Sequence, residues 1–351
     1  MERYLLINDT EDFYHWGCYA TSKSIKEKIQ EKNGTLVGVY TVNQVHAFDS
    51  PPEFVSDFSD IDHFKSKHGE LADLISKCDT VVINGEGTIH HFGKNPKSIL
   101  YILFACKKFF GKKVILINHS CFPYSDEADV IDYYKAGYSS CDFVAARESM
   151  SVDIIRNKLG VNCLHSFDSL PYQVGKISND IKKMVDGPYV CISGAVNYDF
   201  TKSKDVAYRL MKEYPNHKFI YLAGSKTEGV LSEEFLFFES LKEHIPSLEM
   251  IGANSFEEWV SIIKYADLLI SGRYHYTICG LCTATPLVYF PSNTPKIEAI
   301  SKDLHLPKPV VGKNERAFKL KLYISIKLAK FKRWKSLTNK LIVLADNNYK
   351  W

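Results

Sequence analysis

Short runs of apolar, mostly β-branched residues recur along the chain, and longer mixtures of apolar and polar residues separate them. Several of the runs are apolar almost throughout, as is typical of parallel strands that are covered on both faces. The runs predict strands at residues 4–8, 35–40, 80–84, 113–118, 143–146, 189–193, 218–223, 249–252, 268–271 and 286–290. The segments between them predict helices, among them 22–32, 97–110, 203–214, 233–244, 256–265 and 277–283.

Two series of alternating strands and helices, similar in length, predict two Rossmann-like, doubly wound α/β domains that face one another across a cleft. Strand-like character fades between residues 171 and 188. We therefore expect an N-terminal domain over residues 1–172, a C-terminal domain over 173–312 and a tail over 313–351. Ligands of such folds bind beyond the carboxyl ends of the strands, so functional residues are expected directly after each strand.

The composition is that of an ordinary folded protein, since 45% of the 351 residues are hydrophobic and 24% are charged. Acidic residues come too early for a signal peptide, and no apolar run is long enough for a membrane-spanning helix. Nine scattered cysteines, most of them in apolar contexts, indicate reduced thiols in a cytoplasmic protein. Cys279 and Cys282 have CxxC spacing without a second pair. We interpret them as small residues on a packed helix, with redox or metal chemistry as the alternative.

The net charge of +3 conceals a polarised chain. Residues 313–351 contain eleven Lys and Arg against two Asp and Glu, a net charge of +9, which leaves −6 for the rest of the chain. A helical wheel over 318–344 groups apolar side chains on one side and most cations on the other, although 318–328 also alternate as a strand does. The tail is either a C-terminal helix that packs onto the first domain with a solvated basic face, or a segment in peripheral contact with an anionic membrane. Nucleic acid explains neither part of this charge pattern.

Polar side chains follow the first predicted strand. Asn8 and Asp9 end this strand, and His15, Trp16 and Gly17 come before the next helix. Asp9 and His15 are candidates for activating a hydroxyl group, Trp16 is a candidate for stacking on a sugar ring, and Gly17 permits close approach of the backbone. The alternative interpretation is structural, with Asp9 as a turn former and Trp16 in the core.

The loops after the third and fourth predicted strands are polar as well. Two glycines flank Glu86, and His90 and His91 follow. Adjacent histidines without a placed third ligand are weak evidence for a metal site, so polar contacts to a hydroxyl-rich ligand are favoured. Asn118 and His119 follow the fourth strand, where His119 is as readily a structural histidine. The sequence contains no GxGxxG motif and no P-loop, so neither a dinucleotide site nor a Walker-type nucleotide site is supported.

Cations follow three other predicted strands. Arg147 comes after the fifth strand of the first domain, and Arg273, His275 and Lys296 come after the last two strands of the second domain. Guanidinium groups pair with carboxylate and phosphate, and histidine exchanges protons near neutral pH. Convergence of these groups on the cleft would suit a small ligand that carries both phosphate and carboxylate. For Arg147 the alternative is a local ion pair with Glu148.

These features together resemble the polysaccharide pyruvyl transferase family. The resemblance rests on Gly272-Arg-x-His275, on Asn293-Thr-Pro-Lys296 and on Ala146-Arg147-Glu148. The glycine-bearing loops after the first and third strands and Asp168 fit the order of the family's motifs, and the likeness extends over about residues 4 to 300.

The resemblance implies a GT-B-like fold and a transferase that uses phosphoenolpyruvate to place a pyruvate ketal on a sugar of a surface polysaccharide, such as a capsule or exopolysaccharide, or of its lipid-linked precursor. It implies that Arg147 and Arg273 bind the donor's phosphate and carboxylate, that His275 is the general acid and that Lys296 contacts the donor. The first domain would then be the acceptor side and the second the donor side. Asp9 and Glu86 are candidate bases. No cofactor is expected besides phosphoenolpyruvate as co-substrate, no residue is assigned as a metal ligand, and a requirement for a divalent metal ion is left open.

Contacts to the sugar acceptor are expected from six residues: Asn8, His15, Trp16, His90, Asn118 and His119. The loops around Trp16 and Glu86 depart from the family pattern, which affects the identity of the sugar more than that of the donor. A lipid-linked acceptor would place this cytoplasmic enzyme at the inner face of the cell membrane. The alternatives are a GT-B glycosyltransferase that uses a nucleotide-sugar and a non-catalytic glycan-binding protein of the same fold. No acidic pair for binding a ribose is evident in the second domain, which argues against the former.

Overall fold

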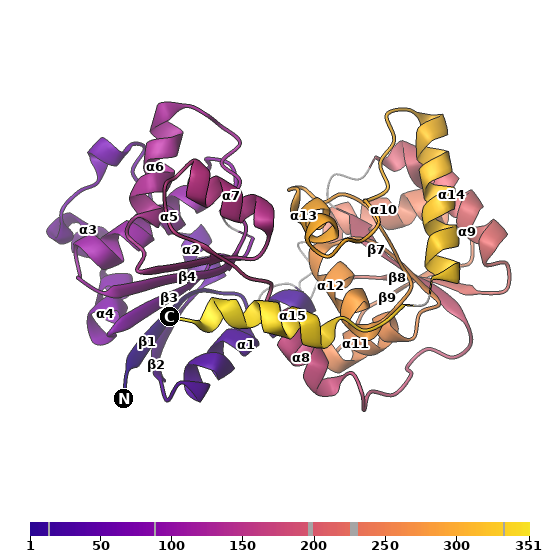
Figure 1. Ribbon diagram of the computed structural model, residues 1–351, viewed down its shortest axis with the longest axis horizontal. Helices are drawn as coiled ribbons and strands as arrows, with labels where there is room; N and C mark the ends of the chain where they lie inside the picture. The colour runs from indigo at the N-terminus through magenta and orange to yellow at the C-terminus, as the bar shows by residue number, and fades with distance from the viewer. Residues whose placement is uncertain (13–14, 88, 196–198, 225–230, 333) are drawn as a thin grey trace. The chain divides into compact units, whose positions relative to one another are not determined.

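A computed structural model describes residues 1–12, 15–87, 89–195, 199–224, 231–332 and 334–351. The chain divides into two compact units (Figure 1). The first unit comprises Met1–Phe13, Thr21–Ser169 and Ile342–Trp351, and the second comprises Tyr14–Ala20 and Leu170–Leu341. Along the chain, the boundary between the long segments of the two units lies between Ser169 and Leu170. Residues 313–341 of the basic tail belong to the second unit.

The first unit contains a six-stranded parallel sheet with the order β2-β1-β3-β4-β5-β6. Its strands are β1 (Arg3–Asp9), β2 (Thr35–Thr41), β3 (Thr80–Asn84), β4 (Lys113–His119), β5 (Phe143–Ala146) and β6 (Leu164–His165). Its helices are α1 (Trp16–Glu31, whose first turn groups with the second unit), α2 (Val42–His46), α3 (Ile61–Lys67), α4 (Gly69–Lys77), α5 (Lys94–Lys108), α6 (Ala128–Tyr138) and α7 (Ser149–Asn157), with the 3-10 turn η1 (Val55–Asp57).

The second unit contains a five-stranded parallel sheet with the order β11-β10-β7-β8-β9. Its strands are β7 (Tyr189–Ala195), β8 (Lys218–Leu222), β9 (Leu248–Ile251), β10 (Leu268–Gly272) and β11 (Leu287–Tyr289). Its helices are α8 (Leu170–Ile177), α9 (Ser203–Glu213), α10 (Leu231–Lys242), α11 (Phe256–Lys264), α12 (Tyr274–Thr283), α13 (Lys296–Asp303), α14 (Glu315–Phe331) and α15 (Thr338–Ala345, which ends in the first unit), with the 3-10 turn η2 (Phe200–Lys202).

The apolar runs of the sequence form the centre of each sheet. Every residue of β3 and of β10 is buried, because helices cover both faces of these strands (Figure 1). The two doubly wound α/β units confirm the predicted fold class.

The order of the strands in each sheet reverses at one switch point. The connections that leave the two adjacent strands at this point run toward opposite edges of the sheet. In the first unit the switch point lies between β1 and β3, and in the second between β7 and β10. Ligands of open parallel sheets bind outside the carboxyl ends of the strands at such points. We therefore expect ligand-binding residues directly after β1, β3 and β10.

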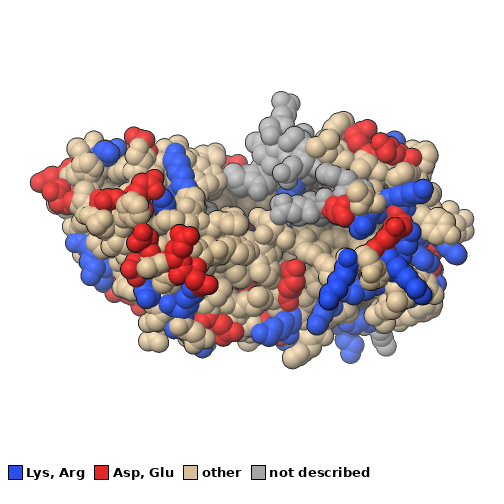
Figure 2. Space-filling model, turned by 90° about the horizontal axis from the view of Figure 1, so that it is seen from above, with Lys and Arg blue, Asp and Glu red and all other residues tan. Residues whose placement is uncertain are grey.

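The basic tail begins with α14, which is apolar on two opposite sides. Phe318, Leu322, Ile326 and Ala329 are buried in the core of the second unit. Leu320, Ile324, Leu328 and Phe331 form a second stripe that is 45–77% exposed. Lys and Arg side chains gather over the region of α9 and α14, at the right of Figure 2. Among the described residues, no helix is both long and apolar enough to cross a lipid bilayer.

The last residues of the chain return to the first unit, where they form the 3-10 turn η4 (Asp346–Tyr349). The side-chain amide of Asn348 donates to the carbonyl of Phe167 at 2.7 Å, and its Oδ1 accepts from the backbone N–H of Asn118 at 3.1 Å. The hydroxyls of Tyr349 and Ser169 are hydrogen-bonded at 2.7 Å. These bonds join the chain end to the strand-end edge of the first sheet.

Candidate active site

Three asparagines connect the strand ends of the first unit. Asn8 and Asn118 have left-handed backbones, with φ of 61° and 56°, which asparagine tolerates better than most residues. Asn8 Nδ2 donates to the carbonyl oxygen of Asn84 at 2.5 Å, and Asn118 Nδ2 donates to its Oδ1 at 3.1 Å. All three side chains are fully buried, so these bonds hold β1, β3 and β4 together below the site.

The candidate bases Asp9 and Glu86 lie on the two sides of the switch point between β1 and β3. Asp9 Oδ2 forms an ion pair with Lys26 Nζ at 2.9 Å, and the carboxylate is almost completely buried. Glu86 is 6% exposed and accepts a hydrogen bond from Thr10 Oγ1 at 3.2 Å. Both carboxylates thus lie at the predicted edge of the sheet, each in contact with a polar side chain.

His119 is buried in the first unit beside a glycine. A Cβ atom at Gly85 would lie only 2.5 Å from the Cβ of His119, so only glycine fits at this point of the loop after β3. Burial, together with the nearby charge of Arg147, lowers the pKa of His119 to about 3. The imidazole is therefore neutral at physiological pH.

Arg147 is held inside the first unit by other polar side chains. Its Nη1 donates to Asp168 Oδ2 at 3.0 Å and its Nε donates to Ser120 Oγ at 3.1 Å, whereas Glu148 is 3.9 Å away. Asp168 also accepts from Thr21 Oγ1 at 3.0 Å. Arg147 is 2% exposed and Asp168 is fully buried, so this ion pair is part of the interior.

The paired histidines after β3 lie apart from the asparagine network. His90 is half-buried and pairs with Phe122 in an isolated β-bridge, and its ring lies 5.2 Å from that of His91. His91 stacks on Tyr124 at 4.5 Å. Among the described residues, no group of metal-type ligands includes either histidine.

In the second unit, Arg273 is placed at the N-terminus of α12 by the end of β10. Its backbone N–H donates to Ser271 Oγ at 3.0 Å, and its carbonyl accepts from the N–H of Thr277 at 3.1 Å. The side chain is half-buried. The first turn of a helix has unpaired N–H groups and a partial positive charge, which together with a guanidinium favours an anion.

Lys296 begins α13 and reaches the start of α12. Its Nζ lies 5.7 Å from the ring centre of Tyr274, and that ring lies 5.4 Å from the ring of His275. The segments after β10 and β11 therefore meet, as their order in the sheet requires. Arg273, His275 and Lys296 come together within one unit. The sequence did not single out Tyr274, which connects them.

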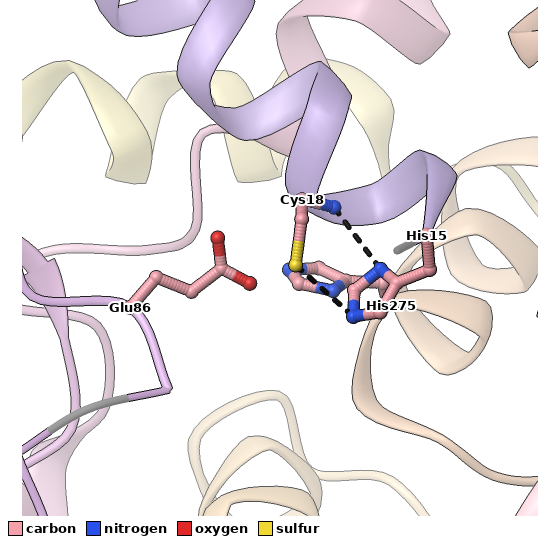
Figure 3. A group of neighbouring side chains, drawn as sticks. All are labelled: His15, Cys18, Glu86 and His275. Carbon is pink, nitrogen blue, oxygen red and sulfur yellow. Dashed lines mark hydrogen bonds between the residues drawn. The ribbon is translucent and has the colours of Figure 1, made fainter. Parts of the chain in front are cut away.

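His275 packs against the first turn of α1. A Cβ atom at Gly17 would collide with the Cβ of His275, so glycine is required for this contact. The rings of His15 and His275 are 5.0 Å apart, and His15 Nε2 lies 3.0 Å from Cys18 Sγ. In Figure 3, His15 and Cys18 extend from the start of α1 and His275 from the start of α12, and the three side chains point toward one another.

Cys18 is not among the site residues expected from the sequence, because its apolar context indicates only a buried thiol. The sequence does contain one signal, namely the spacing of His15 and Cys18, three residues apart at the start of a helix. Trp16, by contrast, donates its indole N–H to the carbonyl of Ala253 at 3.0 Å and meets Tyr19 edge-on. None of the nine cysteines forms a disulfide, and Cys279 and Cys282 are buried in α12.

Comparison with known proteins supplies a family and a fold. A family model described as polysaccharide pyruvyl transferase matches residues 7–294. No curated protein sequence matches the chain.

Solved structures similar to this chain are distant in sequence and cover nearly all of it. The UDP-GlcNAc 2-epimerase of Neisseria meningitidis bound to UDP-GlcNAc is 10% identical, with a TM-score of 0.60 over 99% of this chain and 97% of that chain. The UDP-GlcNAc 2-epimerase of Methanocaldococcus jannaschii is 14% identical, with a TM-score of 0.57 over 96% and 95%. Arabidopsis thaliana UGT89C1 complexed with quercetin is 12% identical, with a TM-score of 0.52 over 99% and 93%. At these identities the likeness supports a GT-B-like fold and nothing finer.

Proposed function

Because the chain belongs to the polysaccharide pyruvyl transferase family, we propose that it transfers the enolpyruvyl group of phosphoenolpyruvate to a sugar of a surface polysaccharide or of its lipid-linked precursor. The product is a pyruvate ketal and the leaving group is phosphate. The observation that carries the proposal is the grouping of Arg273, His275 and Lys296 around the start of α12 in the second unit.

The charges of this group match the donor. Phosphoenolpyruvate has a carboxylate and a phosphate, and the second unit offers Arg273, Lys296 and the N-terminus of α12 to bind them. Arg273 is suited to a bidentate contact with either anion. Arg147 of the first unit is proposed as a further contact to the donor, and its hydrogen bond to Asp168 fixes the orientation of its guanidinium.

The reaction requires an acid next to the site where the carboxylate and phosphate of phosphoenolpyruvate bind. His275 donates a proton to C3 of phosphoenolpyruvate, and the positive character that develops at C2 is attacked by one sugar hydroxyl. Phosphate leaves C2, and a second hydroxyl closes the ketal. Of the two hydroxyl protons, one restores His275 and the other leaves with phosphate, so the step needs no redox partner. Arg273 and Lys296 stabilise the departing phosphate.

The first unit is proposed to serve the acceptor. Asp9 and Glu86, at the switch point between β1 and β3, are the carboxylates that can take a proton from a sugar hydroxyl. The buried asparagines beneath them keep the loops after β1 and β3 in place. All six acceptor contacts expected from the sequence stay predictions. Asn8, Asn118 and His119 are fully buried, so His15, Trp16 and His90 are the ones proposed to reach the sugar first.

A thermal-shift screen with phosphoenolpyruvate and a panel of nucleotide-sugars tests the donor. We expect stabilisation by phosphoenolpyruvate, no such stabilisation for Arg273→Ala, and a normal response for Lys302→Ala. Lys302 is an exposed lysine of the same helix as Lys296 and serves as the matched control. Stabilisation by a nucleotide-sugar alone would refute pyruvyl transfer. Phosphate release in the presence of candidate glycans would then identify the acceptor.

We also propose that α14 holds the enzyme against an anionic membrane, where a lipid-linked acceptor is found. The exposed stripe of Leu320, Ile324, Leu328 and Phe331 is apolar, and α14 contains five Lys and Arg against one Glu. Such a helix can lie in the interface with its apolar side in the lipid and its cations near the headgroups.

Vesicle co-sedimentation tests this contact. Deletion of the tail is unsuitable, because Phe318, Leu322 and Ile326 are part of the core of the second unit. The triple variant Leu320→Ser, Ile324→Ser, Phe331→Ser changes only the exposed stripe, and we expect it to lose binding to vesicles rich in phosphatidylserine. Equal binding of this variant and the unchanged protein would refute the proposal.

A further inference from the structure

We propose that His15, Cys18 and His275 form a binding site for a divalent transition-metal ion, with zinc as the best match. One ring nitrogen of each histidine and the sulfur of Cys18 lie within 4.8 Å of one another (Figure 3). All three residues belong to the second unit, so the site is complete in that unit as far as these ligands are concerned.

The donor set selects the type of ion. A thiolate and two imidazoles suit zinc and similar ions, whereas magnesium and calcium prefer oxygen ligands. Ligand atoms at the corners of a zinc tetrahedron are about 3.3–3.8 Å apart, given bonds of about 2.0–2.3 Å. The separation of 3.0 Å between Cys18 Sγ and His15 Nε2, and the limit of 4.8 Å for the set, are within about 1 Å of this geometry. Three protein ligands leave a fourth position for water.

Hydrogen bonds hold the His15 ring against Cys18 at the start of α1. The backbone N–H of Cys18 donates to His15 Nδ1 at 3.1 Å, so the proton of the neutral ring is on Nε2. Nε2 lies 3.0 Å from Cys18 Sγ, so two of the three proposed ligands already face one another.

Binding has one structural cost. Whichever nitrogen of His15 binds the ion, the bond from the Cys18 N–H is lost, because either the metal or the ring proton then occupies Nδ1. His275 needs no such change of backbone contacts, since Gly17 already lets its ring lie against the start of α1. The site therefore exchanges one helix-capping hydrogen bond for three metal bonds.

Metal binding does not depend on the proposed transfer reaction. If that reaction does take place, an ion bound to His275 withdraws the nitrogen that is needed for proton donation, so zinc is expected to inhibit it. This consequence rests on the proposed function, whereas binding is measured without any substrate.

Cobalt titration of the full chain tests the site. Protein treated with a chelator is titrated with Co²⁺, and we expect a thiolate-to-cobalt charge-transfer band and tetrahedral d–d bands that saturate at one equivalent and disappear when Zn²⁺ is added. Cys18→Ser should lose the charge-transfer band and bind at least tenfold more weakly. Cys141→Ser, at a half-buried cysteine outside the group, should behave like the unchanged protein. His275→Gln should keep the charge-transfer band and bind more weakly.

Two results would overturn the inference. One is the absence of a cobalt band in the folded protein, with folding checked by circular dichroism. The other is an unchanged band in Cys18→Ser. Loss of metal binding would leave stabilisation by phosphoenolpyruvate unaffected, so failure of this site and failure of the proposed transferase reaction are distinguishable.

Discussion

Each unit of the molecule packs one histidine against a glycine at the strand-end edge of its sheet. In the first unit His119 lies on Gly85, and in the second His275 lies on Gly17. His119 is fully buried beside Arg147 and has a pKa of about 3. His275 lies next to His15 and Tyr274 instead.

The difference between the two histidines extends to their neighbours. In the first unit the asparagines and the Arg147–Asp168 pair bind one another, so they hold the loops in position. In the second unit the ammonium group of Lys296 lies over the ring of Tyr274, which neighbours His275, and the thiol of Cys18 lies within 4.8 Å of a ring nitrogen of His275. A close contact between a glycine and a histidine thus accompanies a network of mutually bonded side chains in the first unit and the grouping of Arg273, His275 and Lys296 in the second.

The strongest test of this contrast is the substitution of His275. His275→Gln should lower kcat for pyruvyl transfer by about 10²–10⁴-fold, because a general acid contributes that much. Its free energy of unfolding should fall by about 0.5–3 kcal/mol, so the variant stays folded in the assay. His244→Gln, in the turn that follows α10, is the control and should keep full activity. Normal turnover by His275→Gln would contradict the assigned role.

The two arginines should separate stability from binding. Arg147→Ala leaves the buried carboxylate of Asp168 without its partner and should lower the free energy of unfolding by about 3–5 kcal/mol. Arg273→Ala should cost about 1 kcal/mol or less and abolish the thermal shift with phosphoenolpyruvate. Urea denaturation measures the first effect. The contrast fails if Arg273→Ala is the less stable of the two variants.

The two glycines should respond differently as well. Gly85→Ala forces a methyl group onto His119 and should destabilise the protein by about 1–3 kcal/mol, as overpacking does. Gly17→Ala should displace His275 and so reduce both turnover and cobalt binding. Gly69→Ala has open space around its Cβ and provides the control for both measurements. If Gly17→Ala retains its cobalt spectrum, the packing argument for the metal site is wrong.

The smallest expected effect is on pH dependence. The folded pKa of His119 is lowered to about 3, below the value of about 6.5 in unfolded chains, so the unfolded state binds more protons between these values. Stability should therefore fall as pH decreases below about 6.5, with at most about 1.4 kcal/mol per pH unit from this group. Denaturation series at pH 7 and pH 5 on the unchanged protein and on His119→Gln measure the difference. If the free energy of unfolding changes equally with pH in the two proteins, His119 is not neutral in the folded state.

The sheets could be predicted from the sequence because their strands are apolar on both faces. The run at 80–84 and the observed β3 (Thr80–Asn84) coincide, and all of its residues are buried. The gathering of Arg273, His275 and Lys296 was also predictable, since the residues after parallel strands share one edge of the sheet.

Pairings between distant segments could not be predicted. Asp168 binds Arg147 across 21 positions, and His275 approaches Cys18 across more than 250, so neither pair leaves a local pattern. The helical wheel of the tail could not predict which side of α14 is buried. Both stripes of α14 are apolar, and only the packing of the second unit decides that Phe318 is buried and Leu320 exposed.

The chain end that returns to the first unit has a consequence for synthesis on the ribosome. Residues 21–169 are synthesised before the second unit, yet the hydrogen bonds that Asn348 makes with Asn118 and Phe167 cannot form until residue 348 has left the ribosome. The unit whose long segment is made first therefore waits for residues 342–351, which follow the whole of the second unit along the chain. A nascent chain that has released its residues up to 341 holds every segment of the second unit, while the first unit still lacks residues 342–351.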